Sequence, residues 1–224
     1  DRHSYTMRGC VTAGADVAPT VSAICEVWET PRIAYEVACV THNKRSVRET
    51  LRDAGLQRYQ PKWCCLGASM KDKCIAALRT PAFAREHFGT LAMLYDFTLP
   101  IVLKPLSQRA SRGISIVREA TEYYAAEDKV MRFGNEWLEE ECLTGTEHSA
   151  EILFHDGEMA WFNIVDRHFS YENGLAIELG HVNPTSLPQE AITVIATMMK
   201  QVADALCVYW GPLKADVMMT PEGP

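Results

Sequence analysis

Apolar residues near the start of the chain recur at helical spacing. Val17, Val21, Ile24 and Trp28 lie four, three and four residues apart, which predicts one inward face of a helix. Pro19 fits the first turn of this helix, where a missing N–H costs nothing. We therefore expect a helix over about residues 17–28.

A second helix carries start and stop signals as well as an apolar stripe. Asn43 is a suitable N-cap, and Gly55 follows the helix as a stop. Between them, Val47, Leu51 and Ala54 form the stripe that we expect to face inward.

The middle of the chain changes to short apolar runs that are typical of strands. Residues 101–103 form one run between Pro100 and Pro105, and residues 114–117 form a second run after a polar loop. A helix is expected over about residues 118–127.

The last third predicts a hairpin and a long helix. Asp156-Gly157 lies between two apolar segments, so residues 150–164 predict a hairpin. The clearest helical stripe of the chain follows, with its methionines expected in the core; it consists of Ile192, Ile195, Met199, Val202 and Leu206. Strands gathered apart from helices predict an α+β sheet architecture.

Composition excludes several classes of protein. The 224 residues are 47% hydrophobic and 23% charged, as in an ordinary globular protein, and the net charge of −7 argues against non-specific nucleic-acid binding. No apolar run approaches the roughly 20 residues that cross a bilayer, so we expect no membrane span and a cytoplasmic location. Both ends read as cuts through a larger protein, since the chain starts at Asp1 without Met and ends in a turn at Pro224.

Eight cysteines are spread along the chain without a CxxC pair. This spacing disfavours both a zinc site and a disulfide framework. We expect free, mostly buried thiols in a reduced, intracellular protein.

The polar loop after residues 101–103 is a candidate phosphate-binding element. It runs from Lys104 to Gly113 and contains Ser111 and Arg112, so side-chain cations and backbone N–H groups can surround a polyphosphate. A solvated loop is the plainer interpretation. The chain has neither a GxxxxGK[ST] nor a GxGxxG motif to indicate another nucleotide fold.

Cations also gather at the start of the second helix. Lys44, Arg45 and Arg48 oppose the helix dipole there. They form either a solvated basic face or, as a better explanation of their position, the site of a bound anion.

Three further positions can carry chemistry, each with a plainer alternative. The acidic run Glu139-Glu140-Glu141 is either solvated surface or a hinge whose backbone groups meet a base. Asp216 suits magnesium, but an edge-strand Asp bonded to a neighbour is equally consistent with the pattern. His181 is either an acid, base or phosphate donor or a hydrogen-bonded structural histidine.

Taken in order, these segments resemble the ATP-grasp superfamily over about residues 8–224. THNKRSVRETLRDAGL is similar to a helix of the family that begins with a Lys and carries an Arg, and LPIVLKPLSQRASRGISIV is similar to the strand–loop–strand of its small lid. WLEEECLTGTEHSAEIL resembles the adenine hinge followed by the ribose-binding Glu, and GPLKADVMMTPEGP resembles the strand with the first magnesium ligand.

The resemblance implies a set of ATP-binding residues. Lys44 and Lys104 would bind phosphates, Ser111, Arg112 and Gly113 would form the lid loop, and Asp216 would hold Mg²⁺. Adenine would contact the hinge residues Glu140, Glu141, Cys142 and Leu143, and Glu147 would bind the ribose hydroxyls. The catalytic residues would be Lys104, Arg112 and His181.

The resemblance also implies a fold and its divisions. We expect an α+β ATP-grasp fold, with two subdomains gripping ATP, over residues 41–224 and a lid over about residues 66–135. Residues 1–40 resemble the tail of a preceding Rossmann-like domain. The chain departs from the family in having only Gly113 in its lid loop. The second metal-binding Glu, its Asn partner and a catalytic Arg would follow Pro224, so we expect the domain to be incomplete at its C-terminus.

The function implied is ATP-dependent ligation of a carboxylate to an amine through an acyl phosphate. ELGHVNPTSLP and the preceding Asp166-Arg167 look most like the amino-acid ligases that make dipeptides. A homodimer is compatible with this expectation. Two alternatives stay open: a carbamoyl-phosphate-synthase-like or purine-pathway ligase, and a nucleotide-binding module without catalysis.

Overall fold

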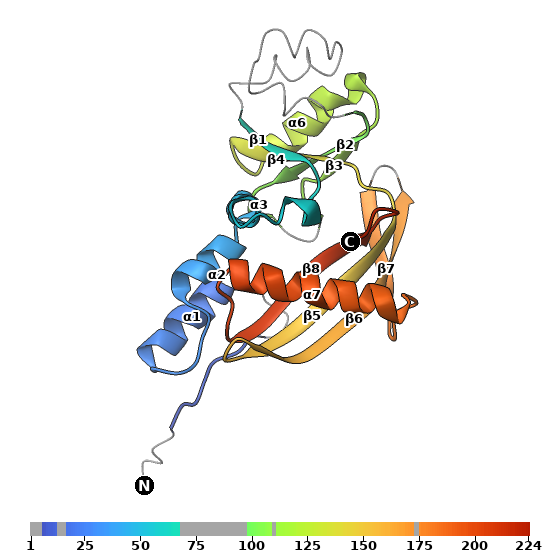
Figure 1. The fold of residues 1–224 in the computed structure, drawn as a ribbon. Helices are drawn as coiled ribbons and strands as arrows, with labels where there is room; N and C mark the ends of the chain where they lie inside the picture. Colours follow the sequence, from blue (N-terminus) through green and yellow to red (C-terminus); the bar gives the residue numbers. More distant parts are fainter. Residues whose placement is uncertain (1–5, 13–16, 68–97, 109–110, 173–174) are drawn as a thin grey trace.

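The protein builds two antiparallel sheets joined along one chain (Figure 1). The computed structural model describes residues 6–12, 17–67, 98–108, 111–172 and 175–224. Each sheet has a helix on one face and an apolar core of its own beneath that helix. The predicted α+β class is confirmed.

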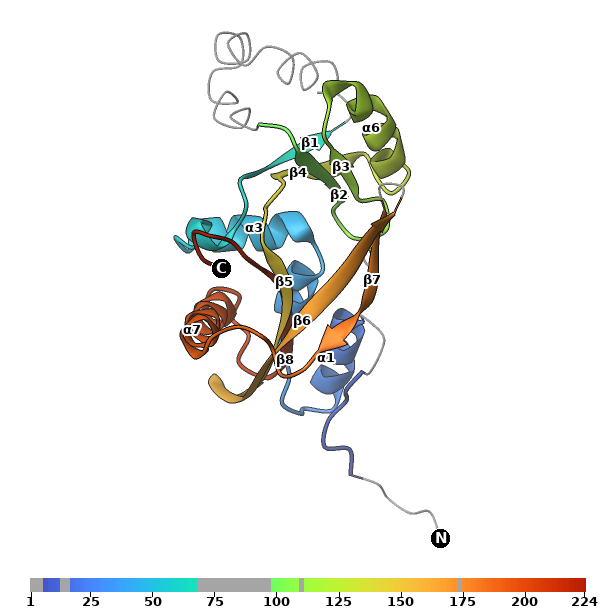
Figure 2. The ribbon, with the colours of Figure 1, turned by 90° about the vertical axis from the view of Figure 1, so that its right-hand side faces the viewer.

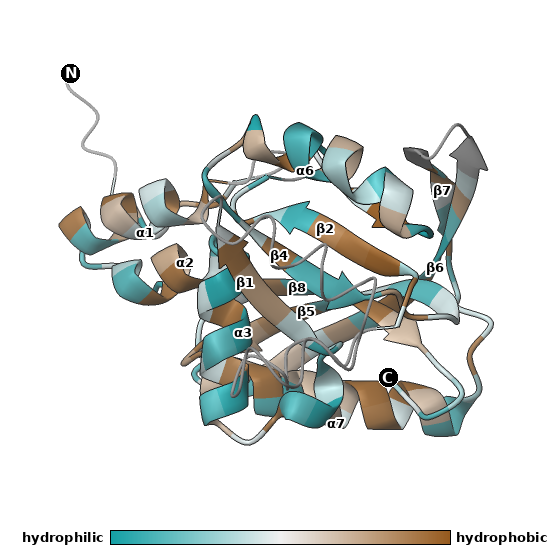
Figure 3. Cartoon of the chain, turned by 90° about the horizontal axis from the view of Figure 1, so that it is seen from above, coloured by the Kyte–Doolittle hydropathy of each residue, from teal (hydrophilic) through white to brown (hydrophobic). Residues whose placement is uncertain are grey.

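The small sheet has the strand order β1-β4-β2-β3. Its strands are β1 (Trp63–Gly67), β2 (Ile101–Pro105), β3 (Ser115–Val117) and β4 (Glu136–Glu141). Helix α6 (Tyr123–Met131) packs on it, and the shared core includes Leu66, Ile101, Tyr123 and Trp137. The apolar character of β1 and β2 is visible in Figure 3.

The two strands predicted in the middle of the chain are confirmed, but the bounds of the following helix are wrong. The helix was expected over about residues 118–127, whereas a 3-10 turn, η4 (Ala120–Glu122), comes first and α6 continues to Met131. The side chain of Glu119 accepts a bond from the Glu122 backbone, and that of Glu122 reaches back to the Glu119 N–H. This capping box sets where the helical segment begins.

The large sheet has the order β7-β6-β5-β8. Its strands are β5 (Thr146–His155), β6 (Glu158–Glu172), β7 (Leu175–Val182) and β8 (Gly211–Met219). The predicted hairpin is confirmed: Asp156 and Gly157, at the turn between β5 and β6, have φ angles of 52° and 79°. Positive φ at both central residues is what a tight hairpin turn requires.

Helix α7 (Gln189–Ala205) covers one face of the large sheet (Figures 1 and 2). Ile195, Met198 and Met199 are buried against the inward residues of the strands, such as Ile152 and Phe154. The predicted long helix and the core role of its methionines are confirmed.

Three helices precede the sheets: α1 (Ala18–Val27), α2 (Tyr35–Thr41) and α3 (Lys44–Asp53), with the 3-10 turn η1 (Gln57–Tyr59) after them. Pro19 lies in the first turn of α1 as predicted, but the predicted inward stripe is wrong at both of its ends, while Val21 and Ile24 in its middle are half-buried. Val17 and Trp28 are exposed, whereas Ser22 and Cys25 are buried. The hydroxyl of Ser22 donates to the Ile33 carbonyl, so a polar residue is satisfied on the buried face.

Helix α3 lies between the two sheets and contacts both. Asn43 accepts a hydrogen bond from the Ser46 N–H at 3.2 Å, and Gly55 follows with a φ of 75°, so the predicted cap and stop are confirmed. Leu51 is buried in the core of the large sheet, with Val47 packed against it. Ala54, expected in the same stripe, is exposed.

Seven of the cysteines lie in the described ranges, and all seven are free thiols there. Only Cys25 and Cys64 are buried, and Cys39 and Cys207 are exposed. The expectation of mostly buried thiols is therefore wrong, because several cysteines occupy helix surfaces and strand ends rather than the two cores.

Candidate nucleotide and substrate site

Three cations surround one buried carboxylate where α3 meets the small sheet. Glu140 of β4 is 1% exposed. It accepts from Arg48 of α3 at 2.9 and 3.0 Å, and from the Lys104 Nζ of β2 at 2.5 Å. Lys44 of α3 lies close enough to these residues for the charges of Lys104, Glu140 and Arg48 to affect its pKa. We call these four residues the cation cluster.

The charges in the cation cluster do not cancel. Burial alone would raise the pKa of Glu140, but the charges of Arg48 and Lys104 outweigh it and lower that pKa, so Glu140 is ionised. Burial, followed by repulsion from Lys104, lowers the pKa of Lys44. Three cations therefore face one carboxylate, and the excess of positive charge favours a bound anion.

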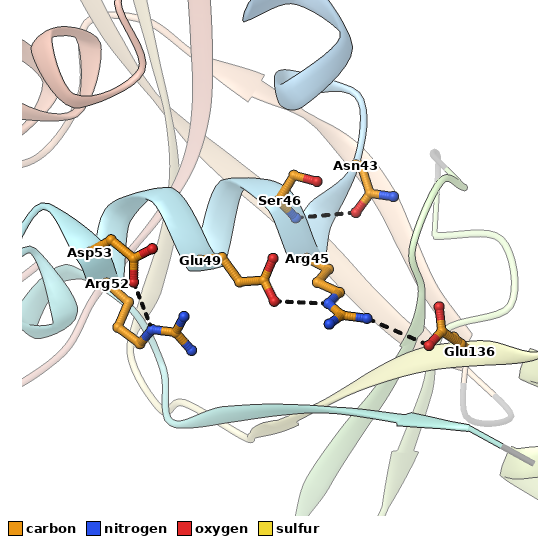
Figure 4. A network of polar contacts seen from close by, with 7 residues as sticks. All are labelled: Asn43, Arg45, Ser46, Glu49, Arg52, Asp53 and Glu136. Atoms are coloured by element: carbon orange, nitrogen blue, oxygen red, sulfur yellow. Dashed lines mark hydrogen bonds and ion pairs between the residues drawn. The ribbon is translucent and has the colours of Figure 1, made fainter. Parts of the chain in front are cut away.

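The first turns of α3 carry two kinds of cation, one exposed and one partly buried. Arg45 contacts Glu49 at 2.9 Å and Glu136 at 3.5 Å, and its side chain is 42% exposed (Figure 4). Arg48, one turn later, points instead to the buried Glu140, and its side chain is 22% exposed. The solvated-face interpretation fits Arg45 and is wrong for Arg48.

In the acidic run of β4, the solvated-surface interpretation is wrong for Glu139 and Glu140, which are buried, whereas Glu141 is only half-buried. Glu139 is 2% exposed and accepts a hydrogen bond from the Tyr123 hydroxyl. Burial raises the pKa of Glu139 to about 7, against the lowering effect of its bonds from Tyr123 and Trp137. Neighbouring carboxyls thus point to opposite sides of one strand, Glu139 into the core and Glu140 toward the cations.

The loop after β2 is tied to the start of α3. The backbone N–H of Lys44 donates to the Leu106 carbonyl at 3.0 Å, and its Nζ donates to the Gln108 carbonyl at 2.5 Å. The loop's polar residues Ser111 and Arg112 are exposed. Within the predicted lid of about residues 66–135, residues 68–97 and 109–110 lie outside the described residues.

Gly113 is the one glycine of this loop and is needed there. Its φ is 75°, and an added Cβ would lie 2.6 Å from the Phe133 ring and 2.7 Å from Pro105. Any L side chain would therefore meet both strain and a clash. The loop closes tightly onto Phe133, just after α6, and onto Pro105 of β2 at this point, while Ser111 and Arg112 lie on its exposed side.

The connection from β4 to β5 passes close to β8. Glu141 and Cys142 use their backbone N–H groups in bonds to Lys62 and Pro100 at 3.0 and 3.3 Å, and Leu143 is half-buried. A Cβ on Gly145 would lie 2.0 Å from the Met219 carbonyl oxygen, so glycine is required there. This close approach fixes how the two sheets are joined.

A second cluster occupies the large sheet and has the opposite charge pattern. Arg167 of β6 contacts Glu178 of β7 at 2.7 Å, Asp216 of β8 at 2.9 Å and Glu147 of β5 at 3.7 Å. His181 joins the group through Glu178 at 2.7 Å. We call Arg167, Glu147, Glu178 and Asp216 the acidic cluster.

Arg167 holds the carboxylate of Glu178 ionised. Its hydrogen bond lowers the pKa of Glu178 to about 2, outweighing burial, which would raise it. The pKa of Arg167 itself is raised: burial would lower it, but Glu178 and Asp216 outweigh that effect. The arrangement of Asp216 is compatible with both alternatives. It lies on an edge strand and is bonded to a neighbour, Arg167, and its side chain is 63% exposed, so that it is accessible to a metal ion.

The donor set fits a hard cation only in part. Carboxylate oxygens are what Mg²⁺ prefers, and one or two protein carboxylates with phosphate oxygens are enough to hold it. Asp216 meets that requirement, although Arg167 engages one of its oxygens. Across the described ranges, no group of three or more His, Cys, Asp or Glu could hold a metal without such outside ligands.

The structure thus brings six of the twelve predicted site residues into two groups, and it places Ser111, Arg112, Gly113, Glu141, Cys142 and Leu143 in neither. Lys44, Lys104 and Glu140 come together in the cation cluster, and Glu147, Asp216 and His181 come together around Arg167. Sequence reasoning grouped Arg48 with Lys44 and Arg45 as a solvated face or an anion site, but it did not identify the pairing of Arg48 with Glu140, and it missed Glu178. The spacing of four between Lys44 and Arg48 puts both on one helix face, and it is the signal that could have identified Arg48.

Comparison with known proteins decides the family. Residues 97–224 match the model of the ATP-grasp domain, which is more than half of the chain. The chain belongs to the ATP-grasp family. A D-alanine–D-alanine ligase of Geotalea uraniireducens (strain Rf4) is 31% identical over 144 residues, which are 63% of this chain and 46% of that ligase. The ATP-grasp chain thus spans about half the length of the curated relatives it matches.

Solved structures share the ATP-grasp fold. The VanG D-Ala:D-Ser ligase from Enterococcus faecalis superposes with a TM-score of 0.71 at 20% identity, covering 92% of this chain and 57% of that one. An L-amino acid ligase from Bacillus licheniformis gives 0.65 at 18% identity, covering 92% and 43%. At these identities the likeness establishes the fold. Separately, the described residues include no helix long and apolar enough to cross a bilayer.

Proposed function

We propose that the protein is an ATP-dependent ligase that joins a carboxylate to an amine through an acyl phosphate, with amino acids as substrates. The observation that carries this proposal is the cation cluster, where three cations meet one carboxylate. An excess of buried positive charge favours a polyanion, and ATP supplies one. Membership of the ATP-grasp family supports ATP as that polyanion.

The nucleotide would lie along the connection between the two clusters. Lys44 and Lys104 would bind the phosphates, with Ser111, Arg112 and Gly113 in the loop that covers them. Residues 140–143 would contact adenine and Glu147 the ribose hydroxyls. Because residues 142–145 join β4 to β5, this path leads from the cation cluster directly into the acidic cluster.

Asp216 would hold magnesium together with oxygens of the ATP phosphates. The bound ion would supply charge neutralisation at the transferring phosphoryl group. Within the chain itself, Arg167 contacts both Asp216 and Glu178.

The chemistry would proceed in two steps. A carboxylate oxygen attacks the γ-phosphorus, the bond to the β–γ bridging oxygen breaks, and ADP leaves with that electron pair. Lys104 and Arg112 would stabilise the charge that develops on the transferred group. The amine nitrogen then attacks the acyl carbon, and inorganic phosphate leaves with the electrons of the broken C–O bond.

The second step requires a neutral amine. His181, 2.7 Å from Glu178 and with a 43% exposed side chain, would accept a proton from the incoming ammonium group. His181 would then combine the two alternatives, since the hydrogen bond to Glu178 would hold the ring in place while it acts as a base.

The remaining assignments follow from the same proposal. Residues 41–224 would form the ATP-grasp domain, with a lid over about residues 66–135, and residues 1–40 would end a Rossmann-like domain. A homodimer and a cytoplasmic location remain predictions.

Phosphate release from Mg-ATP tests the proposal. The protein is incubated with ATP and pooled L-amino acids, with D-alanine and bicarbonate in separate arms. Release that depends on amino acids, with a dipeptide found by mass spectrometry, supports the ligase. Release with bicarbonate alone would favour the carbamoyl-phosphate-like alternative. Binding of ATP without release in any arm would favour the non-catalytic module.

A further inference from the structure

A buried histidine lies directly behind the acidic cluster. His148 of β5 is 2% exposed, and its Nδ1 lies 2.9 Å from an oxygen of Asp166 on β6. Its Nε2 lies 2.7 Å from the hydroxyl of Thr146. His148 and Asp166 are also direct partners in the register of β5 and β6, so their contact is built into the sheet.

Asp166 connects this histidine to the loop between β7 and α7. It accepts a hydrogen bond from the Thr185 hydroxyl and another from the Ser186 N–H at 2.8 Å. The Thr185 hydroxyl oxygen in turn accepts from the Leu187 N–H at 3.2 Å. A continuous chain of hydrogen bonds therefore runs from Thr146, at the start of β5, to residues 185–187.

The chain of hydrogen bonds and the acidic cluster occupy opposite faces of the same strands. Successive side chains of a strand point to opposite faces. His148 follows Glu147, and Asp166 precedes Arg167, so each member of the buried pair is adjacent to a member of the acidic cluster. His148 is also paired with Val217, a buried residue of the core beneath α7.

The ionised carboxylate of Asp166 determines which ring nitrogen of His148 carries a proton. Burial would raise the pKa of Asp166, but bonds from Thr185 and Ser186 and the charge of His148 lower it to about 2. An ionised carboxylate only accepts, so Nδ1 of His148 carries a proton. Nε2 of His148 forms the hydrogen bond with the Thr146 hydroxyl on the other side of the ring.

We propose that His148 and Asp166 are a positioning pair, which holds the loop of residues 183–187 and the ribose-side segment 146–148 as one unit behind the acidic cluster. The proposal rests on the proposed function for the meaning of those two segments. Glu147 lies inside the first segment, and the loop begins two residues after His181. A substrate bound between them would thus meet side chains that share one rigid support.

Packing alone does not account for this pair. Further along β5, four and six residues after His148, Ile152 and Phe154 fill the same sheet face with apolar contacts. Apolar residues of similar volume can stabilise a core as well as a buried ionic pair does. The His–Asp pair differs from apolar packing because Asp166 accepts a hydrogen bond from a backbone N–H of the loop, and this bond fixes the position of the loop. Small displacements of groups that position a substrate are costly to catalysis.

The two ends of the hydrogen-bond chain can be cut separately. Thr185→Val removes the hydroxyl on the loop side, and Thr146→Val removes the hydroxyl on the β5 side, each with little change in volume. Asp166→Asn removes the central carboxylate. Ile164→Ala is the control, because Ile164 is buried on the same strand and face but makes only apolar contacts there.

Hydrogen–deuterium exchange on the whole protein is the deciding measurement. We expect the Ser186 amide to exchange about tenfold faster in Asp166→Asn and in Thr185→Val, and about threefold faster in Thr146→Val, which does not contact the loop. Ile164→Ala should lower the melting temperature without selective acceleration at residues 183–187. Equal exchange at Ser186 in Thr146→Val and the wild type, or the same acceleration in Ile164→Ala, would overturn the proposal.

Binding of the non-hydrolysable ATP analogue AMP-PNP separates this proposal from the proposed function. Thr146→Val should weaken AMP-PNP binding several-fold, and Thr185→Val should leave it within about twofold of the wild type. Failure of the wild type to bind AMP-PNP would contradict the proposed function, and the exchange pattern would still decide the positioning role. Normal analogue binding with unchanged exchange in all three network variants would contradict the positioning role alone.

Discussion

The two clusters are built with inverse charge patterns. On the small sheet, one buried carboxylate is surrounded by three cations that come from α3 and β2. On the large sheet, one arginine is surrounded by three carboxylates that come from β5, β7 and β8. Each pattern leaves a surplus of one sign, which favours a bound anion at the first cluster and a bound cation at the second, where Lys214 also lies 3.7 Å from Asp216.

The clusters also differ in exposure. Glu140 has a 2% exposed side chain, whereas the Asp216 side chain is 63% exposed. Electrostatic effects weaken with solvent screening, so changes in the cation cluster should be large and changes at the acidic cluster smaller. This ordering can be tested by substitutions in each cluster.

Replacing Lys104 with Ala should have the largest effect. It removes the cation that we place on the transferring phosphate, and loss of such a group typically lowers turnover by about 100-fold or more. The measurement is amino-acid-dependent phosphate release, with circular dichroism to establish an intact fold. Arg52→Ala is a matched control, because Arg52 is also a cation of this region but pairs with Asp53 on the exposed side of α3 (Figure 4). Unchanged turnover in Lys104→Ala would remove Lys104 from the mechanism.

Replacing Glu140 with Gln should chiefly affect stability. The change leaves Lys44, Arg48 and Lys104 without their ionised partner, and breaking a buried ion pair from one side costs about 3 kcal/mol. Urea unfolding should show this loss, and added ATP or tripolyphosphate should restore part of it by replacing the missing negative charge. No recovery with either anion would contradict the view that the surplus cations form an anion site.

Replacing Glu139, on the other side of the same strand, with Gln should raise the stability that Glu140→Gln lowers. Its pKa in the folded protein is about 7, above the ordinary value of 4.5. The folded state therefore holds a proton that the unfolded state releases, and stability should fall as pH rises from about 4.5 to 7. Glu139→Gln should flatten this dependence and gain on the order of 2 kcal/mol at pH 7. Urea midpoints across that pH range provide the measurement, and a wild type whose stability rises through this window would contradict the assignment.

Replacing Arg167 with Gln tests the acidic cluster. The three carboxylates would then lose their shared cation, so the pKa of Glu178 should rise from about 2 toward its ordinary range. Mg²⁺, measured by calorimetry without nucleotide, should bind about tenfold more tightly because the competing guanidinium is gone. Weaker Mg²⁺ binding would indicate that Arg167 orders the carboxylates rather than competing for them.

The fold was largely predictable from sequence because its signals are local. The cap at Asn43, the Asp156-Gly157 turn and the stripe of α7 each depend on residues close together in the chain, and all three are confirmed. The stripe of α1 was wrong because burial there depends on contacts from outside the helix: Ser22 bonds to Ile33.

The site was only half predictable, for the same physical reason. Lys104 and Asp216 could be singled out because each lies within a recognisable segment of the chain. The partners that define their charge come from elsewhere: Arg48 meets Glu140 across 92 residues, and Arg167 meets Asp216 from another strand. The burial of Glu139 and Glu140 likewise follows from α3 and α6 packing on β4, which three consecutive glutamates do not reveal.

The smallest effect is expected at Arg45, the exposed counterpart of Arg48 on the same helix. Arg45 contacts Glu49 and Glu136, and all three side chains are more than one third exposed (Figure 4). Exposed pairs contribute at most about 0.5 kcal/mol, so Arg45→Ala should barely change the urea midpoint or AMP-PNP binding. Arg48→Ala, one turn away, should lower both clearly, because it leaves Glu140 buried with one fewer cation. Equal effects at the two positions would mean that the inward-facing cations of α3 have no special role, and the distinction between buried and exposed charge on this helix would fail.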